Sequence, residues 1–219
     1  MRFPAGGNVW SIRLATLCTV PVLVGALAAA VTLSGTVARL DASVVGGAVA
    51  ADAEPFTDWI RSVTALANTD VILIAAVLAI AVCASRRHWR GALTVALALA
   101  VSQMTVTVLK VTMERPRPEQ TEALADPSGF SFPSGHAATA VAVYAVLALV
   151  AARGLTGVAR LAVAGAGTLA VIAIGASRVY LGVHYPTDVV AGWLVGGAIA
   201  LAAWWATEWI GERRRTRPA

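Results

Sequence analysis

Charged residues are scarce in this chain of 219 amino acids: Asp, Glu, Lys and Arg make up 13%, while hydrophobic residues make up 58%. Soluble globular domains carry charges at about a quarter of their positions, so an ordinary soluble domain is excluded. The chain is therefore predicted to be an integral membrane protein. Its net charge of +5 comes from short basic clusters between apolar runs, which orientation in a membrane explains better than a nucleic-acid partner.

Cysteine is equally rare, with only Cys18 and Cys83, and both fall inside apolar runs. A structural disulfide and a thiolate metal site are unexpected on that ground. We interpret both cysteines as small core residues. No cluster of His, Asp and Glu stands apart from the polar blocks described below, so the sequence predicts neither a metal nor another cofactor.

Lysine occurs once, at Lys110, among seventeen basic residues. Because arginine supplies every other positive side chain, this lysine is a specific choice: an ammonium group is a compact point charge, whereas a guanidinium is a planar fork. Taken alone, Lys110 could equally be an interfacial residue whose ammonium reaches the lipid headgroups. Together with the other polar blocks, it is predicted to bind an anion.

Long uncharged runs are abundant, and a membrane-spanning helix needs about 17 to 25 such residues. Six runs reach or approach this length, at residues 14–38, 71–85, 91–109, 137–152, 161–177 and 189–207. They predict an all-α fold, a bundle of six transmembrane helices forming one domain over residues 1–219. The first run resembles a signal peptide, but it exceeds a typical signal core, so we expect a retained signal anchor. Residues 55–63 are expected to form a short interfacial helix.

The distribution of arginine predicts the orientation of this bundle. If both termini share one side, that side holds eleven arginines, including those of a basic tail at 211–219, and only two acids. The positive-inside rule then places both termini in the cytoplasm of a cell that we expect to be bacterial. His88, in a basic loop on that side, is excluded from catalysis. The polar blocks at the ends of spans three to six are expected to face the extracytoplasmic side.

The first of three polar blocks contains Lys110 and Arg117-Pro118. Pro116 and Pro118 disfavour helical geometry in the residues before them, so the third spanning helix should end near Met113. The loop would then hold Arg117 in an extended conformation while Lys110 approaches from the helix end. Two cations are expected to converge on one anion.

The second block, Pro133-Ser134-Gly135-His136, predicts the start of the fourth spanning helix. Ser134 is expected to cap this helix, whose free backbone N–H groups form a cradle for phosphate. Gly135 lets an oxyanion approach the backbone closely, and His136 lies in the first turn. An ordinary helix start would explain this block alone, but a histidine at a membrane helix mouth beside separate cations indicates function.

The third block begins with Ser177-Arg178 at the end of the fifth span and continues to His184 and Asp188. With Pro186 in the first turn of the sixth helix, the spacing of four residues lets the carboxylate of Asp188 hold one ring nitrogen of His184. The other ring nitrogen of His184 stays free to act as a nucleophile. Arg178 adds a third cation. A capping aspartate beside an incidental histidine is the alternative interpretation.

In this order, Lys-x6-Arg-Pro, Pro-Ser-Gly-His and Ser-Arg-x5-His-x3-Asp resemble the signature of the type 2 phosphatidic acid phosphatases, a superfamily that also includes glucose-6-phosphatase and vanadium haloperoxidases. The match runs from Lys110 to Asp188 without a gap. The resemblance implies that His184 is the nucleophile that forms a phosphohistidine, that Asp188 orients it, and that His136 protonates the departing alkoxide. It implies that the phosphoryl oxygens are bound by Lys110, Arg117, Ser134, Gly135 and Arg178.

The expected function is that of a membrane lipid phosphatase acting on a polyprenyl diphosphate, phosphatidic acid or phosphatidylglycerophosphate. Positioned positive charge suffices for phosphoryl transfer, so the reaction is expected to need no metal. The expected partners are the bilayer and the lipid phosphate, with no obligate protein partner. Two alternatives are an anion-binding membrane transporter and a haloperoxidase-like enzyme that uses vanadate. A transporter would leave His184 and Asp188 unused, and the known haloperoxidases are soluble.

Overall fold

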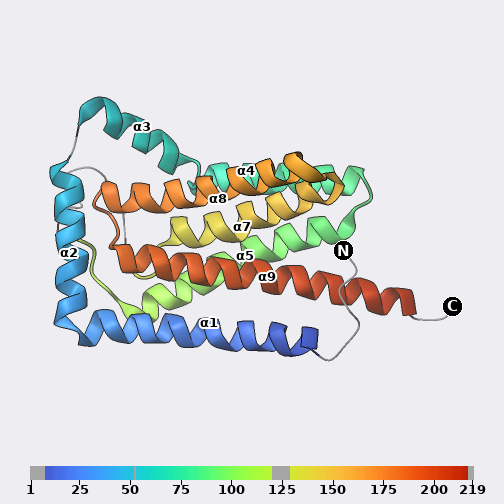
Figure 1. The fold of residues 1–219 in the computed structure, drawn as a ribbon, viewed down its shortest axis with the longest axis horizontal. Helices are drawn as coiled ribbons and strands as arrows, with labels where there is room; N and C mark the ends of the chain where they lie inside the picture. The colour runs from blue at the N-terminus through green and yellow to red at the C-terminus, as the bar shows by residue number, and fades with distance from the viewer. Residues whose placement is uncertain (1–7, 52, 120–128, 217–219) are drawn as a thin grey trace.

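The computed structural model describes residues 8–51, 53–119 and 129–216, and within these ranges it contains helices and no strand. The helices are α1 (Asn8–Leu33), α2 (Gly35–Ala50), α3 (Glu54–Ala65), α4 (Thr69–Ser85), α5 (Trp89–Met113), α7 (Gly135–Ala151), η1 (Ala152–Gly154), α8 (Gly157–Tyr180) and α9 (Pro186–Thr216). The longer helices lie along one direction, while α2 stands across one end of the bundle and α3 slants over that end (Figure 1). The predicted all-α fold is confirmed.

Five helices are long and apolar enough to cross a membrane: Ser11–Leu33, Trp89–Met113, Gly135–Gly154, Gly157–Tyr180 and Pro186–Arg213. The predicted second span is different, because α4 meets the requirement only together with α3. These two helices, Pro55–Ala65 and Thr69–Ser85, are bent by 44° at the break between them. The described residues thus provide five spanning helices, or six if the bent pair counts as one crossing.

Two predictions about the first helix are wrong. The run 14–38 is not one helix, because α1 ends at Leu33 and Ser34 caps the start of α2, accepting a hydrogen bond of 3.4 Å from the backbone N–H of Val37. This cap starts a new helix that crosses the end of the bundle. Cys18 on α1 is exposed rather than part of the core, whereas Cys83 is buried as expected, and both thiols are free.

The helix α7 is packed against α5, α8 and α9, and its residues Ala138, Ala140 and Val143 are fully buried. Two glycines of α9 face it. A Cβ atom at Gly192 would lie 2.7 Å from the carbonyl oxygen of Ser134, and one at Gly196 would lie 2.2 Å from that of Ala138. Such small residues let helix backbones approach closely. Consequently α9 fixes the position of the first turns of α7.

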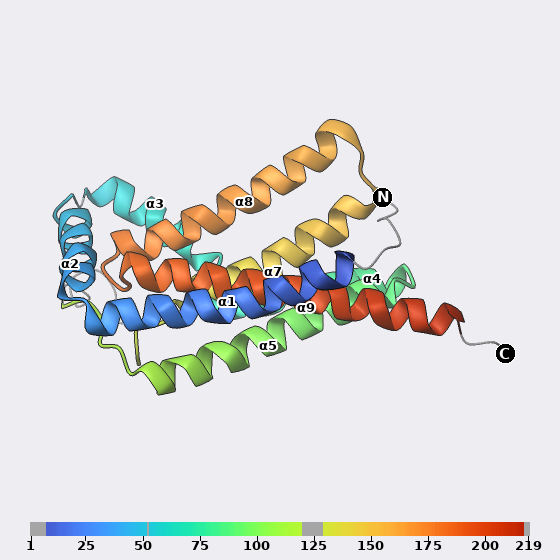
Figure 2. The ribbon, with the colours of Figure 1, turned by 60° about the horizontal axis from the view of Figure 1, so that its bottom comes forward.

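The remaining helices lie around α7 and α9. In Figure 2, α1 runs alongside α9 on one face of the bundle, while α7 and α8 diverge from α9 toward the end of the bundle opposite α2. The last helix continues to Thr216, so the predicted basic tail is helical over 211–216. The rest of that tail, residues 217–219, lies outside the described residues.

Candidate active site

The polar blocks meet at the end of the bundle that α2 and α3 cover (Figure 1). Helix ends carry Lys110, Ser134, Gly135, His136, Arg178 and Asp188, and the loops between them carry Arg117 and His184. Backbone hydrogen bonds join the blocks: the N–H of Ser134 donates to the carbonyl oxygen of Asp188 at 2.9 Å, and that of His184 to Arg178 at 3.2 Å. The predicted end of α5 at Met113 and the cap at Ser134 are confirmed.

His184 is buried, with 2% of its surface exposed. Its Nδ1 lies 3.5 Å from Oδ2 of Asp188, and its Nε2 lies 3.4 Å from Nη1 of Arg117. Because a guanidinium only donates, Nε2 is the acceptor and the ring proton sits on Nδ1, facing the carboxylate. Burial lowers the pKa of His184 to about 4; Asp188 opposes this shift, and the positive charge of Arg117 adds to it. The imidazole is therefore neutral at pH 7.

Asp188 is fully buried in the first turn of α9. Its Oδ1 accepts a hydrogen bond of 2.5 Å from Nη1 of Arg115. Its Oδ2 accepts one of 2.9 Å from the backbone N–H of Tyr185 and another from the hydroxyl of Ser131. The hydroxyl of Ser131 also lies 3.4 Å from Nδ1 of His184. The carboxylate is thus held in place from several sides while it faces the imidazole.

Behind Asp188 lies an ion pair that the sequence did not reveal. Nη2 of Arg115 lies 2.8 Å from Oδ2 of Asp41 on α2, and both side chains are more than nine-tenths buried. The carboxylate of Asp41 also accepts hydrogen bonds from the backbone and the hydroxyl of Thr187. The guanidinium of Arg115 lies over the ring of Tyr185, 4.1 Å from its centroid. This network connects α2 to the carboxylate that faces His184.

Each of the predicted cations donates a hydrogen bond to an oxygen atom at this end of the bundle. Arg117 donates from Nη1 to the carbonyl oxygen of Val183 at 2.8 Å, and Arg178 donates from Nη1 to the hydroxyl of Thr64 at 2.9 Å. The Nε atom of Arg178 is buried and has no hydrogen-bond partner among the described residues. The ammonium of Lys110 donates to the carbonyl oxygen of Phe130. A buried donor without a partner is costly, so an anion would gain by binding to Arg178.

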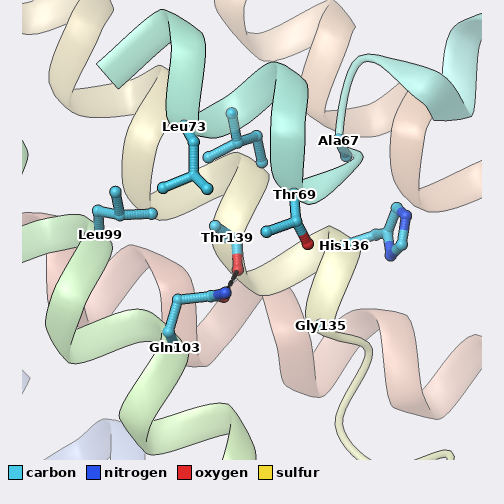
Figure 3. Close-up of a pocket in the computed structure, with 9 residues that line it drawn as sticks. Ala67, Thr69, Leu73, Leu99, Gln103, Gly135, His136 and Thr139 are labelled. Carbon is cyan, nitrogen blue, oxygen red and sulfur yellow. Dashed lines mark hydrogen bonds between the residues drawn. The ribbon is translucent and has the colours of Figure 1, made fainter. Parts of the chain in front are cut away.

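His136 lies beside a cavity of about 120 Å³ between α4, α5 and α7 (Figure 3). Its Nε2 lies 3.3 Å from Oδ1 of Asn68, the residue that precedes α4. The side chain of Ser134 accepts a hydrogen bond from the backbone N–H of Ala137 at 3.4 Å, which caps α7 as predicted. The positive end of α7 therefore lies at the end of the bundle that carries these cations.

All eight predicted residues lie at this end, but their roles stay predictions. Sequence reasoning missed Arg115, Asp41, Ser131 and Asn68. For Arg115 a signal existed, since it stands in the same proline-rich loop as Arg117. For Asp41 there was none, because no spacing links α2 to the third block. The described residues contain no group of three His, Cys, Asp or Glu side chains that could hold a metal, and independence from metal stays a prediction.

Comparison with known proteins identifies the family. Residues 91–212, more than half of the chain, match the model of the PAP2 superfamily. This range contains all three polar blocks, the helices α7 and α8, and most of α5 and α9. The chain belongs to the PAP2 superfamily.

Two curated relatives are named as phosphatases. Phosphatidylglycerophosphatase B of Bacillus subtilis (strain 168) is 40% identical over 114 residues, which are 51% of this chain and 55% of that protein. Decaprenylphosphoryl-5-phosphoribose phosphatase of Mycolicibacterium smegmatis is 36% identical over 124 residues, 55% of this chain and 61% of that protein. The matched segment therefore covers less than two thirds of either relative.

Solved structures extend the likeness over the fold. A transmembrane PAP2-type phosphatidylglycerolphosphate phosphatase from Bacillus subtilis superposes with a TM-score of 0.80 at 26% identity, covering 93% of this chain and all of that one. LpxE of Aquifex aeolicus superposes with a TM-score of 0.59 at 23% identity, covering 74% of this chain and 92% of that one, a likeness of fold alone. Together with the apolar helices, the first match supports a multi-pass membrane protein.

Proposed function

We propose that the protein is a membrane lipid phosphatase that works through a phosphohistidine at His184. One observation carries this proposal: a buried, neutral imidazole has one nitrogen facing the carboxylate of Asp188 and the other facing the guanidinium of Arg117. A nucleophile oriented by a third group is the usual arrangement in covalent catalysis. The phosphatases among the relatives in this family support the hydrolase class.

The reaction follows from this geometry in two steps. When a phosphate group replaces His184 as the partner of Arg117, the lone pair on Nε2 attacks phosphorus, and the bond from phosphorus to the lipid oxygen breaks. The oxygen leaves with the electron pair and takes a proton from the imidazolium form of His136. In the second step, neutral His136 takes a proton from water, the water oxygen attacks phosphorus, and the bond from phosphorus to Nε2 breaks. Phosphate departs and His184 is restored.

Positive charge stabilises both transition states without a metal in this proposal. Lys110, Arg117 and Arg178 would bind the phosphoryl oxygens, and the unpartnered Nε of Arg178 is a donor available for one of them. Backbone N–H groups at Ser134 and Gly135, at the start of α7, complete the cradle. Preorganised donors aimed at the developing charge are an effective form of catalysis in phosphoryl transfer.

The proposed substrate is a phosphate ester or diphosphate of a lipid at the headgroup plane. The substrates named for the curated relatives, phosphatidylglycerophosphate, decaprenylphosphoryl-5-phosphoribose and, in a third relative from Sulfolobus acidocaldarius, undecaprenyl diphosphate, each join phosphate to an apolar chain. A site at the ends of spanning helices reaches such a phosphate while the chain stays in the bilayer. We place this site on the extracytoplasmic side, with both termini in the cytoplasm.

Phosphate release by the purified protein in detergent, with a chelator present, tests the proposal. We expect phosphatidic acid or a polyprenyl phosphate to be hydrolysed, and His184→Ala to abolish release. His88→Ala is the matched control, because His88 lies at the other end of the bundle beside Arg153. Full activity of His184→Ala, or a loss of activity on chelation, would contradict the proposed mechanism. If no lipid phosphate is hydrolysed, the anion-binding transporter becomes the alternative to test.

A further inference from the structure

The cavity beside His136 contains polar side chains that the proposed reaction does not use. Its walls include Leu73 of α4 and Leu99 of α5, and Leu73 is 44% exposed on the outer surface of the bundle. Between these apolar walls and His136 lie Gln103 of α5 and Thr139 of α7 (Figure 3). The cavity therefore leads from the start of α7, at Gly135 and His136, to the lipid-facing surface past an amide and a hydroxyl.

A chain of hydrogen bonds fixes the orientation of this amide. The hydroxyl of Ser102, which is fully buried, donates to Oγ1 of Thr139 at 3.3 Å. The hydroxyl of Thr139 donates in turn to Oε1 of Gln103 at 3.0 Å. Because Oε1 is the acceptor in this chain, the –NH₂ group of Gln103 is the end left for other partners. Nε2 makes no hydrogen bond to another described residue.

An amide donor without a partner is unfavourable in a membrane-spanning helix. Gln103 is itself exposed on the surface of the bundle, so within a bilayer its free donor would meet lipid rather than water. Polar side chains within such helices are rare and tend to have a functional role, and an unsatisfied donor away from water costs free energy. Gln103 lies seven residues before Lys110, about 10 Å deeper along α5 and on the same face. A ligand whose phosphate lies near Lys110 and whose chain follows the cavity would pass this donor, and an acceptor on that ligand would satisfy it.

The position of the donor specifies where on a lipid this acceptor must be. Thr139 follows His136 by three residues on α7, a rise of about 4.5 Å. In the proposed reaction His136 contacts the oxygen that leaves. In a diacylglycerol lipid, only two glycerol carbons and an ester oxygen separate that oxygen from the nearest ester carbonyl carbon. A polyprenyl chain presents only hydrocarbon at this depth.

We propose that the –NH₂ group of Gln103 binds an ester carbonyl of the substrate, and that the enzyme selects diacyl glycerophospholipid phosphates over polyprenyl phosphates. This inference rests on the proposed function, because it takes the lipid phosphate to be bound at His184. It assigns to Ser102 and Thr139 the role of positioning the amide. The apolar residues of the cavity accommodate the start of an acyl chain.

Matched substrates test this selectivity without any mutation. We would measure kcat/KM of the wild type for a diester phosphatidic acid and for its diether analogue with the same chain lengths, which lacks the carbonyl oxygens. The net free energy of one hydrogen bond predicts that kcat/KM for the diester is about three- to tenfold higher than for the diether. A farnesyl or longer polyprenyl phosphate should react no faster than the diether. Equal rates for diester and diether would overturn the inference while leaving the proposed function intact.

Variants then attribute the preference to the amide. Gln103→Leu should lower kcat/KM for the diester to the level of the diether and leave the diether rate unchanged, which a general loss of structure would not do. Thr139→Val, which releases the amide, should give a smaller loss of preference. Met104→Leu is the control, because Met104 is 72% exposed on the next position of the same helix. If Gln103→Leu keeps the diester preference, the assignment to Gln103 is wrong; if the wild type hydrolyses none of these lipids, the proposed function itself fails.

Discussion

Asp188 is fully buried, and its two carboxylate oxygens face different partners. One oxygen accepts from Arg115, and the other faces His184, Ser131 and the backbone of Tyr185. Arg115 is shared with Asp41, so one buried cation compensates two buried carboxylates. Removing a partner from a buried ion pair costs more than the pair contributes in total, because a charge is left without compensation.

Arg115→Met is therefore expected to lower the free energy of unfolding by about 3–5 kcal/mol and to reduce kcat strongly, since Asp188 loses its anchor. The double variant Arg115→Met/Asp41→Asn should recover part of this stability, because it removes one of the two uncompensated carboxylates. Thermal unfolding in detergent and kcat measure both effects. Arg61→Met is the control, since its pair with Asp58 is exposed and such pairs contribute little. Equal effects of Arg115→Met and Arg61→Met would contradict this account.

The protonation of His184 gives a second prediction at this scale. Burial holds its pKa at about 4, below the usual value near 6.5. The imidazole therefore stays neutral and nucleophilic as the pH falls through 6, and it takes up a proton, losing the lone pair, only near pH 4. Titration of the ring signals by NMR, assigned with His184→Gln, should give a midpoint near 4 in the free protein. A midpoint near 6.5 would show that the ring is not desolvated as described.

At the scale of elements, the contact between α7 and α9 positions the site. The backbone of α7 approaches α9 at Gly192 and Gly196, and the first of these glycines faces Ser134 itself. Neither contact leaves room for a methyl group, because the atom it would meet is a backbone carbonyl oxygen that cannot turn aside. Ser134 and Asp188 are joined by a backbone hydrogen bond at this same contact.

Gly196→Ala is expected to push α7 and α9 apart and to lower stability by about 1–3 kcal/mol, as overpacking usually does. The adjacent Gly197 provides a matched control, because a Cβ there would lie 4.0 Å from the nearest atom, a side-chain carbon of Val141. Gly197→Ala should leave the melting temperature nearly unchanged. The comparison of the two melting temperatures checks the packing, and similar values would mean that the helices do not meet at Gly196.

Local sequence features predicted several element boundaries but not the contacts between distant elements. The prolines around Arg117 predicted the end of α5 at Met113, and Ser134 predicted the start of α7, because each acts on its own neighbours. The break at Ser34 was missed, since the apolar run continues across it. The pairing of Asp41 with Arg115 depends on how α2 crosses the end of the bundle, and no local pattern carries that information.

At the scale of the whole molecule, α2 and α3 cover the end of the bundle where the polar blocks meet (Figure 1). Asp41 on α2 and Thr64 on α3 both bind arginines of that end. These helices therefore support the site in addition to connecting the spans. The opposite end carries the basic cluster around His88 and Arg153, which we propose to lie in the cytoplasm on the basis of the positive-inside rule.

Single cysteines in a variant without Cys18 and Cys83 test this orientation. Asp58→Cys, at an exposed position of α3, should react in intact cells with a maleimide that does not cross the membrane. Ser85→Cys, at an exposed position at the end of α4, should react only after permeabilisation. The opposite pattern of labelling would place the site in the cytoplasm and contradict the proposed topology.

The central claim is that His184 carries the phosphoryl group during turnover, and trapping this intermediate tests it most directly. Protein mixed with a radiolabelled lipid phosphate and quenched in alkali within the first turnover should retain label that is stable in alkali and released in acid, as a phosphohistidine requires. Peptide mapping should place the label on His184, and His184→Gln should retain none. Rapid phosphate release by the wild type with no trapped label, or label on another residue, would contradict the account.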